Sequence, residues 1–264
     1  MKISVYNTWD HVPKAEATGE DISILAWDGE YRRGDVIEFS GLQKDRFYVV
    51  KVDPTIEAAL VLIKEETIIY TIPFDEKKTS YNPLSFFGNR HYISIRYARD
   101  YEINSYRNLS VNTFDQHEVS GVYPHASANV ETRGEAVFAA RNAIDGNIAT
   151  KSHGEWPYES WGINRQDDAE ITIDFGRAVD IDEIHLYTRA DFPHDNWWVQ
   201  GTLTFSDGSK KVIDMDKKID EPLIYKFDTI KNITWVKLGE LIKADDPSPF
   251  PALTQFEVYG TESK

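Results

Sequence analysis

Short runs of alternating apolar and polar residues recur along the whole chain. The clearest run covers residues 170–175, where Ile171, Ile173 and Phe175 alternate with Glu170, Thr172 and Asp174. Alternation with a period of two over about four to eight residues is typical of a strand with one face in a core and the other in water. This pattern indicates antiparallel sheets.

Comparable runs recur at roughly 8–12-residue spacing between Gly, Asp, Pro and Asn signals, which is typical of sandwiches and barrels. We expect strands over 22–27, 35–39, 46–52, 58–63, 67–72, 91–97, 171–175, 181–188, 201–205, 211–213, 223–227, 233–238 and 253–259. Only 100–107 and 135–143 have a helical pattern, and the second runs into Asp145-Gly146, a plausible helix stop. The sequence therefore predicts an all-β protein.

The two sets of strands are separated by a polar segment, residues 108–132. The chain of 264 residues also exceeds the usual length of one domain, about 100–200 residues. We therefore expect two β-sandwich (jelly-roll) domains, 1–112 and 113–264, with one large sandwich as the alternative.

Composition narrows the classes of partner. The formal net charge is −15 and no cluster of Lys and Arg interrupts it, so nucleic acid and membrane surfaces are poor partners. The chain has no cysteine, which excludes disulfides, thiolate metal sites and a cysteine nucleophile. The first residues lack the apolar stretch of a secretory signal, so we expect a cytoplasmic protein unless a signal has been removed.

Three separated stretches of the second half have landmarks of one family. They are Asn142-Ala143-Ile144-Asp145-Gly146-Asn147 with Thr150, then Trp161 with 171–176 and 181–184, and finally Phe256-Glu257-Val258-Tyr259-Gly260. From about Tyr123 onward their order and spacing resemble the discoidin (coagulation-factor type C) family of carbohydrate-binding modules. This resemblance implies a galactose-binding-like β-sandwich for the second domain.

The resemblance also implies a structural calcium ion. Its expected ligands are the carboxylates of Asp145 and Glu257, the hydroxyl and carbonyl of Thr150, and the backbone carbonyls of Ala143 and Asn147. Calcium prefers about six to eight hard oxygen ligands, which such a turn can supply. The alternative is that Asp145-Gly146 is only a turn and Glu257 a solvated strand residue.

Three loop segments, 153–161, 189–198 and 243–251, gather aromatic and charged side chains, and the resemblance implies that they meet at one end of the second sandwich. A sugar needs a flat apolar wall and planar groups for its hydroxyls. We expect walls from Trp156, Phe192 and Trp197, and polar contacts from His153, Glu155, Arg189, Asp191, His194, Asn196, Asp245 and Asp246. We expect Trp161 in the core and leave Arg133 outside the predicted site.

The predicted function is non-catalytic carbohydrate binding at this loop end. No His-Glu-x-x-His, Gly-x-Ser-x-Gly, phosphate-binding or dinucleotide motif occurs in the sequence. Two alternatives stay open. The same histidines and carboxylates could serve a glycan-processing hydrolase, or the Trp and Pro loops could form a protein interface in a cytoplasmic scaffold or homo-oligomer.

Overall fold

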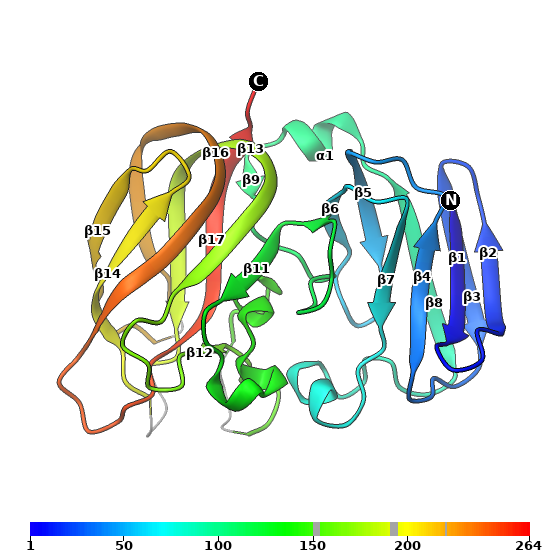
Figure 1. Ribbon diagram of the computed structural model, residues 1–264, viewed down its shortest axis with the longest axis horizontal. Helices are drawn as coiled ribbons and strands as arrows, with labels where there is room; N and C mark the ends of the chain where they lie inside the picture. Colours follow the sequence, from blue (N-terminus) through cyan, green and yellow to red (C-terminus); the bar gives the residue numbers. More distant parts are fainter. Residues whose placement is uncertain (150–153, 191–194, 220) are drawn as a thin grey trace.

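The computed structural model describes residues 1–149, 154–190, 195–219 and 221–264, and it contains two β-sandwiches that lie side by side (Figure 1). Nearly all regular elements are antiparallel strands. The predicted all-β class with two sandwiches is therefore confirmed. Among the described residues, no helix is long and apolar enough to cross a membrane.

The N-terminal sandwich has two sheets. One has the order β2 (Pro13–Thr18), β1 (Lys2–Asn7), β4 (Asp35–Ser40) and β7 (Thr67–Thr71). The other has the order β10 (Val122–Tyr123), β6 (Ala59–Ile63), β5 (Arg46–Lys51), β8 (Arg90–Tyr97) and β3 (Ile22–Asp28). Alternate residues such as Ile37, Phe39 and Tyr48 are fully buried between the sheets. Strands β1 and β2 were not predicted, and β2 lacks the apolar alternation because it is an exposed edge strand.

The C-terminal sandwich is formed by one continuous antiparallel sheet. Its order is β12 (Trp161–Gly162), β17 (Ala252–Glu262), β13 (Ile171–Thr188), β16 (Leu223–Lys243), β14 (Trp198–Phe205) and β15 (Lys210–Asp214). β11 (His125–Ala128) pairs with β13, and β9 (Arg107–Asn108) pairs with β17.

The two longest strands of this sheet each contain two of the predicted strands. β13 joins the predicted 171–175 and 181–188, with Gly176 at a φ of 65°, and β16 joins 223–227 and 233–238, with Asn232 at a φ of 57°. Residues in the left-handed region interrupt the regular pleat, so these strands change direction without ending. The sheet thereby encloses a single core that includes Trp161, which is fully buried as predicted.

The helix predicted over 135–143 is wrong. The chain instead forms the short 3₁₀ turns η2 (Thr132–Gly134), η3 (Ala136–Phe138) and η4 (Ala140–Ile144), and Ala139 between the last two is extended, with a ψ of 151°. The break lets the Asn142 side chain donate to the Ala136 carbonyl, a contact that a continuous helix would not allow. The helix predicted over 100–107 is shorter, α1 (Asp100–Asn104), because Arg107 enters β9.

The connection between the sandwiches passes back and forth between them. Residues 107–108 pair with the C-terminal sheet, Phe114 and Val122 join the N-terminal core, and residues 125–128 return to the C-terminal sheet. The predicted boundary at residue 112 lies within this crossing segment.

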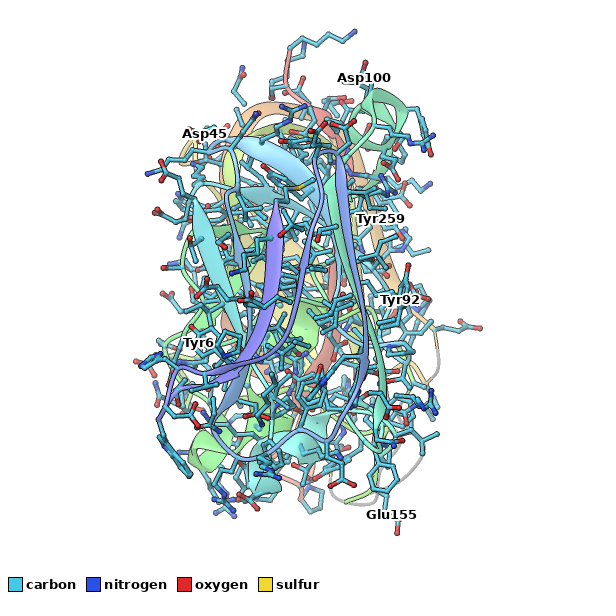
Figure 2. All side chains as sticks on the ribbon, turned by 90° about the vertical axis from the view of Figure 1, so that its right-hand side faces the viewer. Tyr6, Asp45, Tyr92, Asp100, Glu155 and Tyr259 are labelled. Atoms are coloured by element: carbon cyan, nitrogen blue, oxygen red, sulfur yellow. The ribbon has the colours of Figure 1, made fainter. Side chains whose placement is uncertain are left out.

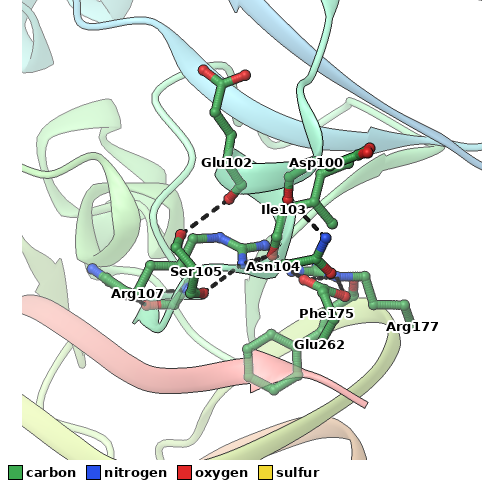
Figure 3. A network of polar contacts seen from close by, with 11 residues as sticks. Asp100, Glu102, Ile103, Asn104, Ser105, Arg107, Phe175, Arg177 and Glu262 are labelled. Atoms are coloured by element: carbon green, nitrogen blue, oxygen red, sulfur yellow. Dashed lines mark hydrogen bonds and ion pairs between the residues drawn. The ribbon is translucent and has the colours of Figure 1, made fainter. Parts of the chain in front are cut away.

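A polar network lies at the upper end of the contact between the two sandwiches, which we call the joint (Figure 3). The Glu262 carboxylate accepts hydrogen bonds from Arg107 at 2.6 Å and from Arg177 at 2.8 Å. The Arg177 guanidinium also lies over the Phe47 ring of the N-terminal sandwich, 5.0 Å from its centroid. Asp100 of α1 lies at this end of the molecule and Glu155 at the opposite end (Figure 2).

Candidate functional site

The lower end of the C-terminal sandwich in Figure 1 carries a pocket of about 250 Å³, which we call the loop-end pocket. Its lining comes from the η2–η3 turns, the segment around 154–165, the end of β13 and the start of β17. The side chains and backbone that line it are Thr132, Arg133, Glu135, Phe138, Gly154, Tyr158, Gly162, Ile163, Asn164, Arg165, Arg189, Asp195, Phe250, Pro251 and Ala252.

Three aromatic rings form the apolar part of this pocket. Phe138 and Tyr158 meet edge to face, with centroids 6.4 Å apart and an interplanar angle of 88°. Phe250 is half-buried between Pro249 and Pro251, which stiffen the segment before β17. Phe138 belongs to η3, and Tyr158 and Phe250 come from loops that the rigid sandwich positions, as is usual for binding residues.

Arg189, directly after β13, lines the pocket with 1% of its surface exposed. Its guanidinium donates to the Ser160 hydroxyl at 3.2 Å and pairs with Asp195 at 3.3 Å. It also lies 5.7 Å from the Tyr158 centroid and 6.0 Å from that of Phe138. A buried guanidinium held between rings and a carboxylate gives the pocket a rigid polar floor.

At the rim, Arg133 and Glu135 form a fork of two hydrogen bonds, at 2.6 and 2.7 Å. These bonds lower the pKa of Glu135 below its usual value, so its carboxylate is ionised at neutral pH. Arg165 lies at another part of the pocket, with its guanidinium 4.5 Å from the Phe250 centroid.

The trace around 161–165 explains how Arg165 reaches the pocket. β12 pairs with β17 through Trp161 and Leu253, and the Trp161 ring stacks on Trp198 in the core, with centroids 6.4 Å apart. Directly after β12, the Thr132 hydroxyl accepts a hydrogen bond from the Asn164 backbone at 2.9 Å. This hydrogen bond therefore fixes the position at which the loop that carries Arg165 leaves the core.

The predicted sugar-site residues do not all meet in this pocket. Arg189 lines it. The exposed Glu155 and Asp245 do not, and Asp246 accepts a hydrogen bond from the Ser248 backbone. Asn196 is buried and bonds the Ala244 carbonyl, while Lys217 lies over the ring of Trp197. His153, Asp191, Phe192 and His194 lie outside the described residues.

Trp156 lines a second pocket of about 260 Å³ between the two sandwiches, which we call the interdomain pocket. Its other lining residues are Thr55, Ile56, Glu57, Ser80, Tyr81, Asn82, Ser85, Thr113, Arg141, Asp145, Gly146, Asn147 and Glu159. Both sandwiches contribute to it, and Arg141 lies at the contact between them.

Arg141 is 8% exposed and crosses from one sandwich to the other. Its guanidinium donates to the Asp115 carbonyl at 2.9 Å and to the Ser80 hydroxyl at 3.4 Å, and it lies 4.6 Å from the Tyr81 centroid. Burial raises the pKa of Asp145 to about 7 although Arg141 opposes that shift, and burial also raises the pKa of Glu159.

The calcium ligands implied by the resemblance do not come together as expected. Gln255, rather than Glu257, reaches the Asp145 turn, because its amide donates to Asp145 at 2.8 Å and to the Asn142 carbonyl at 2.7 Å. Glu257 instead pairs with His185 at 3.3 Å and accepts from Tyr259. Ala143 is fully buried. The Asn147 amide bonds Glu159, and Thr150 lies outside the described residues.

Among the described residues, no group of three or more His, Asp or Glu side chains is arranged to hold a metal ion. The Gln255 amide donates to the Asp145 carboxylate, and Glu257 pairs with His185 instead, so these two side chains do not fit the calcium site that the resemblance implies.

Sequence reasoning missed several residues of the loop-end pocket. Tyr158 and Phe250 belong to segments that it selected, but Phe138 was assigned to a helix and Arg133 was left outside the site. The one available signal for Arg165 was its place shortly after the buried Trp161.

A scan against protein-family models found no match, and a search of curated proteins found none either. Among solved structures, the chain is similar to chitosan-binding module 1 of a chitosanase/glucanase from Paenibacillus sp. IK-5, with 19% identity over 58% of this chain and 98% of that one, at a TM-score of 0.40. It is also similar to the family 32 carbohydrate-binding module of NanJ from C. perfringens, solved with galactose, with 20% identity over 51% and 91% of the two chains and a TM-score of 0.38.

A fucose-binding module of Streptococcus pneumoniae, SpX-3, has 15% identity over 59% of this chain and 98% of that one, at a TM-score of 0.39. At these identities and TM-scores we base the function on the side chains of the pocket itself.

Proposed function

We propose that the protein binds a carbohydrate in the loop-end pocket and does not turn it over. The observation that carries this proposal is the convergence of three aromatic rings with fixed guanidinium and carboxylate groups on one cavity of about 250 Å³. Ligand sites are typically concave and largely apolar, with a few polar groups that fix orientation.

The chemistry of the lining suits a sugar. Phe138, Tyr158 and Phe250 offer apolar faces for the C–H side of a pyranose ring. The Arg133–Glu135 fork and Asn164 offer planar donors and acceptors for hydroxyl groups. Because these polar groups are held by partners or by the backbone, little side-chain entropy is lost on binding.

The charges in the pocket support binding without hydrolysis. Glycoside hydrolysis commonly uses two carboxyl groups, one of which must stay protonated as the acid. Glu135 is bound by Arg133, which lowers its pKa, and Asp195 is ion-paired with Arg189. Neither carboxyl group lies in the setting of a general acid.

We also infer that the C-terminal sandwich is a discoidin-type, galactose-binding-like module. In support, the strand 171–176 and the closing strand 256–260 lie in neighbouring strands β13 and β17, and the turn at Asp145 is bound to β17 through Gln255. The landmarks that are separated in the sequence thus belong to one packed unit.

The experiment is a binding screen of mono- and oligosaccharides by ligand-observed NMR, with affinities measured by calorimetry. Phe250→Ala should weaken binding about tenfold or more, because aromatic anchors dominate binding energy and a tenfold change is about 1.4 kcal/mol. The matched control is Phe87→Ala, which removes a ring that is 70% exposed on the N-terminal sandwich.

The control variant should bind as the unaltered protein does. Equal binding by Phe250→Ala and the unaltered protein would contradict the proposal, and so would cleavage of chromogenic glycosides by the purified protein.

A further inference from the structure

Among the described residues, three guanidinium groups and two carboxylates line the loop-end pocket. The guanidinium groups belong to Arg133, Arg165 and Arg189, and the carboxylates to Glu135 and Asp195. Arg133 is paired with Glu135, and Arg189 with Asp195. Among the described lining residues, Arg165 is therefore the guanidinium that is not paired with a carboxylate of the pocket, on a chain whose formal net charge is −15.

The Arg165 side chain is exposed, and its guanidinium lies over the Phe250 ring at 4.5 Å from the centroid. Across the four described ranges of the chain, no hydrogen bond or ion pair of this guanidinium is found, although exposed acidic residues follow at 167 and 168. Its donors are thus available to a ligand that lies against Phe250.

The backbone at this point is held in an uncommon conformation. Asn164 and Arg165 both lie in the left-handed region, with φ of 48° and 63°, which costs free energy for residues other than glycine. Two hydrogen bonds fix the turn, from the Asn164 backbone to Thr132 at 2.9 Å and from the Gln166 backbone to the Ile163 carbonyl at 2.8 Å. Strained residues that the surroundings hold in place are concentrated at ligand-binding sites.

We propose that the loop-end pocket prefers saccharides that carry a carboxylate, and that Arg165 determines this preference. The inference rests on the proposed function, because it names the class of sugar for the same pocket. The ring would stack on Phe250 while the carboxylate accepts two hydrogen bonds from the guanidinium, whose planar fork matches a carboxylate. The negative charge of the ligand would then lie against the positive charge of Arg165.

The test compares galacturonate with galactose, which differ by a carboxylate in place of a hydroxymethyl group. The unaltered protein should bind galacturonate about tenfold more tightly than galactose, as expected for one charge-assisted contact. Arg165→Gln should lower the ratio of galacturonate affinity to galactose affinity from about ten to about one. Arg90→Gln, an exposed arginine on the N-terminal sandwich, is the matched control and should keep the preference.

Further binding measurements show which acidic sugar the pocket prefers, and they separate this inference from the proposed function. The affinities for glucuronate and N-acetylneuraminate are measured in the same way. If Arg165→Gln lowers the affinity for any of these acidic sugars, the inference is supported. Phe250→Ala should weaken the binding of acidic and neutral sugars alike, which tests the proposed function. If that loss occurs but Arg165→Gln keeps the preference, or if galactose binds as tightly as every acidic sugar, the inference on Arg165 is wrong while carbohydrate binding stands.

Discussion

The loop-end pocket and the interdomain pocket have nearly equal volumes, about 250 and 260 Å³, and both combine aromatic rings with charged groups. Their polar groups differ in what they bind. In the interdomain pocket, Arg141 bonds Asp115 and Ser80, and Thr113 donates to the Glu57 carbonyl at 2.7 Å. In the loop-end pocket, the Arg165 guanidinium lies over the Phe250 ring and has no hydrogen bond or ion pair with another described residue.

This difference separates a structural joint from a binding site. Polar groups that cross between the sandwiches are already satisfied by protein partners, so a ligand would gain little from them. The Arg165 guanidinium has no hydrogen bond or ion pair with any residue that the structure describes, so it can bind a ligand without first breaking one. Residue type alone does not make this distinction, since both pockets contain Arg, carboxylates and aromatic rings.

The largest expected effect is the loss of folding stability when a contact at the joint is removed. Arg141→Met should lower the free energy of unfolding by about 3 kcal/mol, because it removes a buried charged donor together with its hydrogen bonds to the Asp115 carbonyl and the Ser80 hydroxyl. Arg165→Met, at the exposed rim of the other pocket, should change it by less than about 0.5 kcal/mol. Urea unfolding of the two variants measures both. Equal losses would contradict the division into joint and site.

A somewhat smaller effect is expected at the opposite end of the joint. Glu262→Gln should destabilise the protein by about 2 kcal/mol, because Arg107 and Arg177, both less than a fifth exposed, lose their shared carboxylate. Glu240→Gln removes an exposed pair with Lys210 and should cost less stability than Glu262→Gln does, because solvent screens exposed ion pairs. Thermal melts of the two variants make the comparison, and equal shifts in Tm would show that this network adds no stability.

The change in folding stability with pH that arises at the joint should be smaller still. A hydrogen bond from the His125 ring to the Asp115 carboxylate raises the pKa of His125 above its usual value of 6.5, and the charge of Asp174 adds to this shift. The stability that protonated His125 contributes is therefore fully present below pH 6.5, and it is lost as the pH rises through the raised pKa of the folded state. The unaltered protein should lose about 1 kcal/mol more stability than His125→Gln between pH 6 and 9. Parallel pH profiles would contradict this assignment.

Removal of divalent cations should have the smallest effect. Since Gln255 donates its amide to Asp145 and Glu257 binds His185, we expect EDTA to leave Tm unchanged. A ligand that binds only the native state stabilises it, so a lower Tm in EDTA that calcium restores would show that the ion is held after all.

The sequence predicted the class of fold well because strand alternation is a local signal. Ile171, Ile173 and Phe175 are all fully buried, as their spacing requires. It failed where tertiary contacts override local preference. The alanine-rich segment 135–143 has helical propensity, yet Arg141 and Asn142 bond groups on other segments and the chain folds as separate turns.

The site was predicted less completely for a related reason. Clustering of aromatic and charged residues in loops selected the segments of Arg189, Tyr158 and Phe250, but it could not tell which side of each loop faces which pocket. Trp156 and Tyr158 are two residues apart, and they line different pockets. Arg133 and Arg165 join the site through left-handed backbone conformations that the sequence does not signal.

The most direct test of carbohydrate binding in the loop-end pocket is a crystal structure of the protein with galacturonate at saturating concentration. We predict a sugar ring against Phe250 or Tyr158, with its carboxylate at the Arg165 guanidinium. A sugar bound in the interdomain pocket beside Trp156, or an empty loop-end pocket in crystals of a protein that binds the sugar in solution, would contradict it.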